Sequence, residues 1–336
     1  MAEKNPKKDL TIADVAEALG VSKTTVSRAI SGKGRIGRET RRRVLDYIEE
    51  HDYKPNVIAQ GLAQSKTYNL CVAMPRNYEV VDWNFFQACL FGIQEMAESA
   101  GYDILMTTCR MNDISSLERI IANHKVDGVV LMRTFLEDAQ LAYLQQKKIP
   151  FVTTGSTDYS DVVQIDHDHR SACRELTSYL LMRGFGRIAL VGEDEGYVVT
   201  RSRLEGFREA YEEQGISLDE SLLFLNPDNR TQVEKTVGEI LERGVDCILC
   251  MDDADTSRVL RALREKKVRV PGDVRVASFY NSTILDDHVP SITSLSFDAK
   301  EVGMVACKLL LQLIEGLEVP MKTLLPYEVV LKDSTK

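Results

Sequence analysis

The segment from Thr11 to Ile30 constrains the fold of this chain most, because its apolar residues repeat at the spacing of two short helices. Thr11 is placed to cap the first helix, Gly20 to end it, and Ser22 to cap the second. We expect an inward face made of Ile12, Val15, Ala16 and Leu19 in the first helix and Val26, Ala29 and Ile30 in the second. The pattern predicts two helices joined by a tight turn, a helix-turn-helix.

The second helix carries polar residues on the face that we expect to be exposed. The outward-facing residues are Lys23, Thr24, Thr25 and Arg28. We expect these four to contact DNA together with Thr11, Ser22 and Ser27. Lys and Arg donate hydrogen bonds to guanine, and Thr offers a hydroxyl and a methyl group, which suits a helix entering the major groove. An ordinary helical hairpin with a solvated polar face is equally compatible with this pattern alone.

Charge is divided unevenly along the chain. Residues 1–66 contain 13 Lys and Arg against 9 Asp and Glu, a net charge of +4, whereas the rest carries a net charge of −13. A basic head attracts a polyphosphate, and an acidic body discourages loose wrapping by nucleic acid. The asymmetry therefore favours DNA binding by the head. Arginines at the start of a third helix are the expected phosphate contacts: Arg35, Arg38, Arg41, Arg42 and Arg43.

Length and composition exclude several other classes of protein. The 336 residues are enough for a small head and a body of one large or two medium lobes. No apolar run approaches the roughly 20 residues that cross a bilayer, and the N-terminus lacks a signal-peptide core, so we expect a cytoplasmic protein without a membrane partner. The seven cysteines lie mostly in apolar segments, which predicts buried thiols. Cys247 and Cys250 should point to opposite faces of one strand.

The body alternates short apolar runs with amphipathic segments, the pattern of parallel sheets covered on both faces. The expected strands are Leu70–Met74, Ile104–Thr107, Gly128–Met132, Phe151–Thr154, Ile188–Val191, Leu222–Leu225, Cys247–Met251 and Val274–Phe279. The clearest helices are Phe86–Ala100, Ser171–Arg183, Arg203–Gln214, Val233–Arg243, Thr256–Lys266 and Lys300–Glu315. The predicted fold class is an all-α head followed by two doubly wound α/β lobes with a ligand cleft between them.

The segment between head and body reads YKPNVIAQGLAQSKT and resembles a short helix more than a plain linker. Its apolar positions Val57, Ile58 and Leu62 are unusual for a linker. A helix of about two turns does not persist alone in water, so we expect it to fold against a partner copy or a DNA groove.

These observations divide the chain into three parts. The head spans residues 1–52, the hinge 53–67 and the body 68–336. Within the body we expect one lobe of about 68–165 with 297–322, and a second of about 166–296 with 323–334.

Four segments together resemble the lactose-repressor (LacI/GalR) family of bacterial transcription regulators over about residues 10–333. They are TIADVAEALGVSKTTVSRAI, YKPNVIAQGLA, RSRLEGF and VRVPGDVRVASF. The resemblance implies a homodimer that binds a palindromic operator in double-stranded DNA as a repressor. It places Lys23, Thr24 and Arg28 at base-reading positions, and it places Asn56, Ala59, Gln60 and Leu62 in the hinge. The hinge leucine is expected to wedge into the minor groove.

The body then resembles a periplasmic sugar-binding fold, which implies a small-molecule effector, a sugar or sugar derivative. The implied pocket consists of Phe85, Phe86, Arg203, Asp252, Tyr280 and Phe297. Arg203 matches the family's effector-contacting arginine, whose guanidinium can hold vicinal hydroxyls or a carboxylate. Tyr280 stands where the family often has an aspartate, so the identity of the sugar stays open. Gly37 replaces a capping serine, and no heptad tail follows Lys332, which favours a dimer.

Two alternatives to a DNA-binding regulator remain. The run from Asp166 to His169, with Asp252, Asp253 and Asp255, is compatible with a metal-dependent hydrolase, although its spacing matches no fixed metal motif. A sugar-binding sensor without DNA output is the other. The GxGxxG spacing of residues 32–37 follows a helix and not a strand, which is wrong for a dinucleotide loop. We expect no enzyme activity, no cofactor and no metal.

Overall fold

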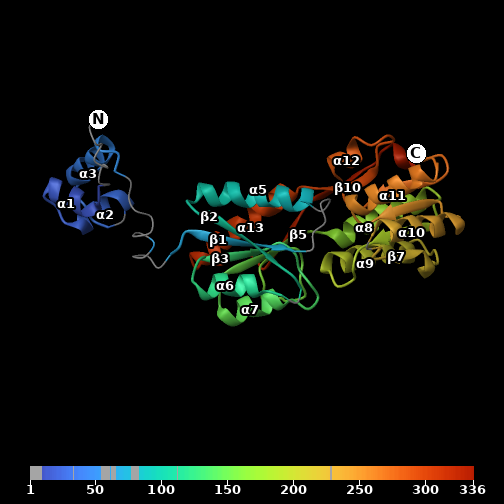
Figure 1. Cartoon of the computed structure of the whole chain (residues 1–336), viewed down its shortest axis with the longest axis horizontal. Helices are drawn as coiled ribbons and strands as arrows, with labels where there is room; N and C mark the ends of the chain where they lie inside the picture. Colours follow the sequence, from blue (N-terminus) through green and yellow to red (C-terminus); the bar gives the residue numbers. More distant parts are fainter. Residues whose placement is uncertain are drawn as a thin grey trace, which may run out of the picture. The chain divides into compact units, whose positions relative to one another are not determined.

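The computed structural model describes residues 10–32, 34–53, 61, 66–76, 83–111, 113–227 and 229–336. It separates into two compact units, residues 1–67 and residues 68–336 (Figure 1). The hinge residues Asn56, Ala59, Gln60 and Leu62 lie outside the described residues. In the described part of the chain, no helix is long and apolar enough to cross a membrane.

The head contains the three helices α1 (Ile12–Leu19), α2 (Lys23–Ser31) and α3 (Arg38–Glu50). Thr11 caps α1 in a reciprocal pair with Asp14, and Gly20 ends it in the left-handed conformation at φ 64°. This confirms the predicted helix limits. The small core is formed by Val15, Ala16, Val26, Ala29, Val44 and Tyr53.

The first lobe of the body is a six-stranded parallel sheet in the order β11-β5-β4-β3-β1-β2. Its strands are β1 (Asn69–Pro75), β2 (Asp103–Cys109), β3 (Gly128–Leu131), β4 (Phe151–Thr154), β5 (Gln164–His167) and β11 (Lys322–Leu325). Two helices cover each face, α5 (Trp83–Ser99) with α13 (Ala299–Ile314), and α6 (Ser115–Ala122) with α7 (Ala139–Lys147) (Figure 1). Each face therefore has its own apolar core.

The second lobe repeats this plan with a six-stranded sheet in the order β12-β10-β9-β8-β6-β7, in which only β12 runs antiparallel to its neighbour. Its strands are β6 (Ile188–Gly192), β7 (Leu223–Leu225), β8 (Cys247–Cys250), β9 (Arg275–Ser278), β10 (Thr293–Phe297) and β12 (Tyr327–Val330). Its helices are α8 (His169–Met182), α9 (Val198–Glu213), α10 (Arg230–Glu242), α11 (Asp253–Glu265) and α12 (Thr283–Asp286), with short 3₁₀ turns at Glu220–Leu222 and Asp333–Thr335.

Three lobe limits differ from the sequence prediction. Lys322–Leu325 pairs in parallel with Gln164–His167, so both strands belong to the first sheet and lobe one extends beyond residues 165 and 322. Phe297, expected in lobe one, ends β10 in the second sheet. Helix α9 begins at Val198 and not at Arg203, which places Arg203 in the second turn of the helix.

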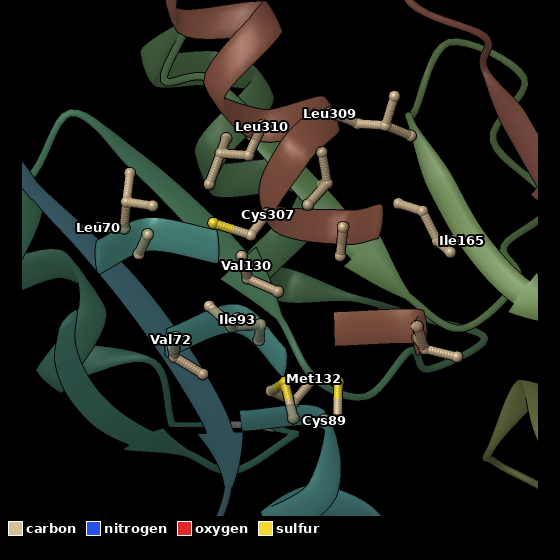
Figure 2. Close-up of a cluster of buried hydrophobic side chains, with 14 of the residues drawn as sticks. Leu70, Val72, Cys89, Ile93, Val130, Met132, Ile165, Cys307, Leu309 and Leu310 are labelled. Carbon is tan, nitrogen blue, oxygen red and sulfur yellow. Dashed lines mark hydrogen bonds between the residues drawn. The ribbon is translucent and has the colours of Figure 1, made fainter. Parts of the chain in front are cut away.

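The core between α5, α13 and the first sheet shows how closely these layers pack. Figure 2 shows Leu70, Val72 and Val130 of the strands gathered in one buried cluster with Ile93 of α5 and Cys307 of α13. Close approach of the two helices depends on glycine. A Cβ atom added at Gly303 would collide with the backbone oxygen of Cys89, and one added at Gly92 would collide with that of Lys300.

Candidate functional sites

The outer face of α2 presents most of the residues predicted to read DNA. Lys23, Thr24, Ser27 and Arg28 are exposed. Ser22 caps the helix by accepting a hydrogen bond from the Thr25 N–H at 3.1 Å. Thr25 itself is half-buried, and its hydroxyl lies 2.9 Å from Ser22 Oγ, so it is less outward-facing than the helical spacing predicted.

The arginines around α3 do not all have the same role. Arg35, Arg38, Arg41 and Arg42 are exposed. Arg43, although also exposed, donates a hydrogen bond to the backbone oxygen of Leu19 at 3.3 Å and so satisfies a carbonyl at the end of α1. Arg43 therefore supports the head's fold, which the prediction of a phosphate contact did not include.

The caps at the start of α1 and α3 differ. The Thr11 hydroxyl donates to Asp14 Oδ2 at 2.6 Å, so in the free protein this predicted DNA contact is engaged in capping. Gly37 begins α3 without a side-chain hydrogen bond, which matches the missing serine noted in the sequence.

The body contains a pocket between its lobes with about 750 Å³ of empty space, part of it open to solvent. The six predicted effector residues, Phe85, Phe86, Arg203, Asp252, Tyr280 and Phe297, all line it. The remaining lining residues are Met132, Arg133, Thr134, Thr154, Gly155, Asp166, His167, His169, Glu193, Val199 and Asp253. The fold thus brings together residues that are more than 200 positions apart in the sequence.

Most polar lining residues lie at or just beyond the carboxyl ends of parallel strands. Arg133 follows β3, His167 ends β5, Glu193 follows β6, and Asp252 and Tyr280 follow β8 and β9. Ligands of open α/β sheets bind beyond this edge. The sequence prediction missed Arg133, Glu193 and His167 as pocket residues, although each lies at or near the end of a strand.

Arg203 reaches the pocket from α9. Its Nη1 donates a hydrogen bond to the Met251 backbone oxygen at 2.6 Å, and its buried Nε has no hydrogen-bond partner among the described residues. The neighbouring Asp252 caps α11, accepting from the Asp255 N–H at 2.8 Å. Burial raises the pKa of Asp252, and the hydrogen bond from Asp255 opposes that rise.

The aromatic residues divide between the core and the pocket wall. Phe86 is only 3% exposed and packs in the core of the first lobe. Phe85 also belongs to the first lobe. Its ring packs edge to face against that of Tyr280 in the second lobe, with 6.1 Å between the ring centroids. Tyr280 in turn stacks on Phe297 at 6.1 Å, with 19° between the rings. This series of rings forms an apolar wall of the kind on which a sugar face can rest.

His167 and His169 are buried beside this wall. The Phe297 ring centroid lies 4.9 Å from that of His167 and 4.8 Å from that of His169. Asp166 lies 3.2 Å from His169 Nε2 and accepts a hydrogen bond from the Ser156 N–H at 2.7 Å. Burial raises the pKa of Asp166, but His169 and the hydrogen bonds from Ser156 outweigh burial and hold that pKa at about 2.

The comparisons with known proteins match the head and much of the body. A model of bacterial regulatory proteins of the lacI family matches residues 11–56, and a periplasmic binding protein-like domain matches residues 177–335. The first match covers α1 to α3, and the second covers most of the second lobe. The chain belongs to the lacI family of bacterial regulatory proteins.

Relatives of this lacI-family chain match along nearly its whole length. The HTH-type transcriptional regulator DegA of Bacillus subtilis is 28% identical over 335 residues, covering 97% of this chain and 98% of DegA. A solved structure of the transcriptional regulator CelR with cellobiose is 26% identical, with a TM-score of 0.73 over 97% of this chain and 99% of CelR. These relatives are transcription regulators and not enzymes. This lacI-family chain is likewise a DNA-binding transcription regulator and not an enzyme.

A third comparison concerns the fold alone. A lac repressor dimer bound to operator and an anti-inducer has a TM-score of 0.79 at 22% identity, covering 98% of this chain and 99% of the repressor. It shares the succession of a helical head and two α/β lobes.

The two lobes of this lacI-family chain contact each other directly beside the pocket. Phe135 forms an isolated antiparallel bridge with Tyr197, and the Leu136 N–H donates to the Gly196 oxygen at 3.1 Å. The Arg133 guanidinium lies 4.5 Å from the centre of the Tyr197 ring. These contacts hold the second lobe against the first along one side of the cavity.

The residues considered for a metal site are arranged differently from a metal centre. Within the described ranges, no group of three or more His, Cys, Asp or Glu residues is placed to hold a metal. All seven cysteines are buried and free, as the sequence predicted for their burial. Cys247 and Cys250 lie in different cores, on opposite faces of the second sheet.

Proposed function

We propose that this lacI-family regulator binds a palindromic operator as a homodimer and that a small molecule in the pocket between its lobes sets its affinity for DNA. The observation that carries the proposal is that one chain combines an exposed polar face on α2 with a pocket between two lobes in a separate unit. Neither feature alone distinguishes a regulator from a hairpin or a sugar-binding module.

On the DNA side, the proposed base contacts are Lys23, Thr24 and Arg28, which are exposed on α2. The exposed arginines around the start of α3 supply contacts to phosphate groups, which position the head without reading sequence. Leu62 of each subunit wedges into the minor groove at the centre of the operator and bends it, so that more protein surface meets the DNA.

On the effector side, we propose a carbohydrate or a derivative of one. The Arg203 Nε lacks a hydrogen-bond partner within the described part of the chain, and the wall of Phe85, Tyr280 and Phe297 offers an apolar surface in the same pocket. A hydroxyl-rich ring with apolar C–H faces satisfies both. The CelR structure, which contains cellobiose, supports the class of ligand without identifying it.

The effector acts through its differential affinity for two conformations of the body, only one of which is compatible with operator binding. We propose that the chain is a repressor and that it works in the cytoplasm, where the operator is.

The test begins with selection of a preferred duplex from a random-sequence library by the purified full-length chain. Replacing Leu62 by Ala should then weaken binding to the selected duplex about tenfold or more, because the wedge that offsets the cost of unstacking is lost. Gel-shift titration measures the affinity, and thermal unfolding checks that the body stays folded.

Leu317→Ala is the matched control, because Leu317 is an exposed leucine of the body. Unchanged binding by the Leu62→Ala protein contradicts the hinge assignment. Absence of any preferred inverted-repeat duplex contradicts the proposed function as a whole.

A further inference from the structure

Two buried histidines in the pocket each have one ring nitrogen with no hydrogen-bond partner among the described residues. These atoms are His167 Nε2 and His169 Nδ1. His167 is 2% exposed and His169 is 8% exposed, and both rings line the pocket. A buried polar nitrogen without a partner is destabilising, so these atoms are candidates for hydrogen bonds that form only with a ligand.

The hydrogen bonds already made by each ring determine what its other nitrogen offers. His167 Nδ1 lies 3.3 Å from the Leu325 backbone oxygen, and because a carbonyl only accepts, Nδ1 carries the proton. His169 Nε2 lies 3.2 Å from Asp166 Oδ1, and an ionised carboxylate also only accepts. In its neutral form, each ring therefore presents a lone pair, and not an N–H, at its unpartnered nitrogen.

Protonation at neutral pH does not reverse this arrangement at His169. Burial lowers the pKa of His169 below its ordinary value, and attraction to Asp166 offsets only part of that decrease. The ring stays neutral, and His169 Nδ1 stays an acceptor.

The surroundings add two further constraints. No described residue accepts the N–H of Arg203 Nε, so the ligand must accept there as well as donate to the histidines. Carboxyl groups also outnumber guanidinium groups around the cavity: Asp166, Glu193, Asp252 and Asp253 against Arg133 and Arg203. A phosphate dianion or a carboxylate only accepts hydrogen bonds and would oppose both the lone pairs and these acids.

We propose that His167 and His169 are specificity-determining residues that accept hydrogen bonds from ligand hydroxyl groups, so that the pocket selects an uncharged polyol over its phosphorylated or acidic derivatives. This inference rests on the proposed effector function and goes further by naming the atoms that discriminate. A hydroxyl group both donates and accepts, which fits two lone pairs and one N–H. Phe297, in contact with both rings, positions them for this role.

The first experiment measures ligand selectivity in the full-length protein. Cellobiose and glucose are compared with cellobiose phosphate, glucose 6-phosphate and glucuronic acid by thermal shift and titration calorimetry. We expect at least one neutral sugar to bind, and its charged derivatives to bind about tenfold or more weakly. A charged derivative that binds more tightly than its neutral parent overturns the proposal.

The second experiment uses substitutions that keep the existing hydrogen bond of each ring and remove the second ring nitrogen. An Asn side chain superimposes its amide on the Nδ1 position and a Gln side chain on the Nε2 position, so His167→Asn retains the donor to Leu325 and His169→Gln retains the donor to Asp166. Each should weaken neutral-sugar binding about tenfold and reduce the preference over the phosphate. His124→Asn is the control, because His124 is exposed at φ 48°, a conformation that Asn tolerates.

A purely structural role gives a different result: a lower melting temperature without ligand and an unchanged ratio of neutral-sugar to phosphate affinity, which overturns the proposal. A third measurement needs no ligand. Nitrogen-15 NMR of the imidazoles at pH 7.5 should find the Nδ1–H tautomer at His167 and the Nε2–H tautomer at His169, and the opposite tautomer at either ring overturns it.

Duplex binding by the same preparations separates this inference from the proposed function. Salt-sensitive binding to a selected duplex together with tighter binding of a sugar phosphate refutes the histidine inference and leaves the regulator standing. No response to any member of the panel contradicts the sugar effector, and with it the inference.

Discussion

The head and the body place their functional residues in opposite environments. The head has a small core of six buried residues, and its proposed contacts are exposed side chains on one face of α2. The body has four apolar cores, and its proposed contacts line a pocket that two lobes enclose. The head is basic and the body acidic. The head is therefore suited to binding a long polyanion, and the body to binding a small molecule that fits between its lobes.

Because of this difference, the exposed residues of the head and the pocket residues of the body should respond differently to substitution. Exposed residues on α2 carry little of the head's stability, so changing them should alter DNA affinity alone. Pocket residues also take part in capping and packing, as Asp252 does for α11. Changes there combine ligand effects with stability effects, and each needs a control.

The largest expected effect belongs to the packing of the body. In Gly303→Ala, the new methyl group meets the backbone oxygen of Cys89, which no side-chain rotation can relieve. We expect a loss of about 3 kcal/mol in the free energy of unfolding of the body. Hydrogen exchange should show lost protection in α5 and α13, with α1 to α3 unaffected.

Gly186→Ala is the control, since no atom of the described residues lies within 4 Å of a Cβ atom at Gly186. Equal destabilisation by both substitutions, or lost protection in the head, would argue against separate units.

A smaller effect should follow from removing one base-reading side chain. Arg28→Ala should weaken binding to the selected duplex by about 2 kcal/mol, because a guanidinium that reads guanine contributes about 1–3 kcal/mol of discrimination. The effector-induced rise in melting temperature should be unchanged. Fluorescence anisotropy with labelled duplex measures the first quantity.

For comparison, Arg183→Ala removes an exposed arginine of the body and should leave duplex affinity as it is. If both substitutions weaken duplex binding equally, the head does not read DNA through α2.

The smallest expected effect sharpens the comparison within the head. Ser22→Ala removes the cap that accepts from the Thr25 N–H, which should cost about 1 kcal/mol of head stability. Amide exchange of α2 in the full chain reports this loss. Ser27→Ala, at an exposed position inside α2, should not lower protection, because Ala is the better helix former.

The head was predictable from sequence because its structure is local. Helix spacing, Thr11, Gly20 and Ser22 determine α1 and α2 without reference to distant residues. Thr25 and Arg43 were exceptions, because their contacts with Ser22 and Leu19 depend on atomic positions that spacing does not give.

Most strands and helices of the body were predictable from the sequence, but the pairing of strands from distant segments of the chain was not. The eight expected strands correspond to β1–β4 and β6–β9, most of which are runs of apolar residues in the sequence. The strands β5, β10, β11 and β12 were missed because polar residues interrupt their apolar runs, as in QIDH and TSLSF. Their pairing is with segments far along the chain, such as Lys322–Leu325 with Gln164–His167.

The pocket shows the same limit. Resemblance pointed to six lining residues, and the fold brings all six to one cavity. His167 and His169 were noticed only as a weak metal motif, because their significance depends on which ring nitrogen is already bonded. That information is present only in the three-dimensional structure.

The central claim is that a ligand in the body and the DNA-reading face of the head are linked. The most direct measurement is the operator affinity of the wild type and of Arg203→Ala, with and without a saturating sugar identified by the panel. We expect the sugar to change the wild-type dissociation constant by about 5- to 150-fold. The variant should bind operator with wild-type affinity and show no change. A variant that responds to the sugar as the wild type does would contradict the account.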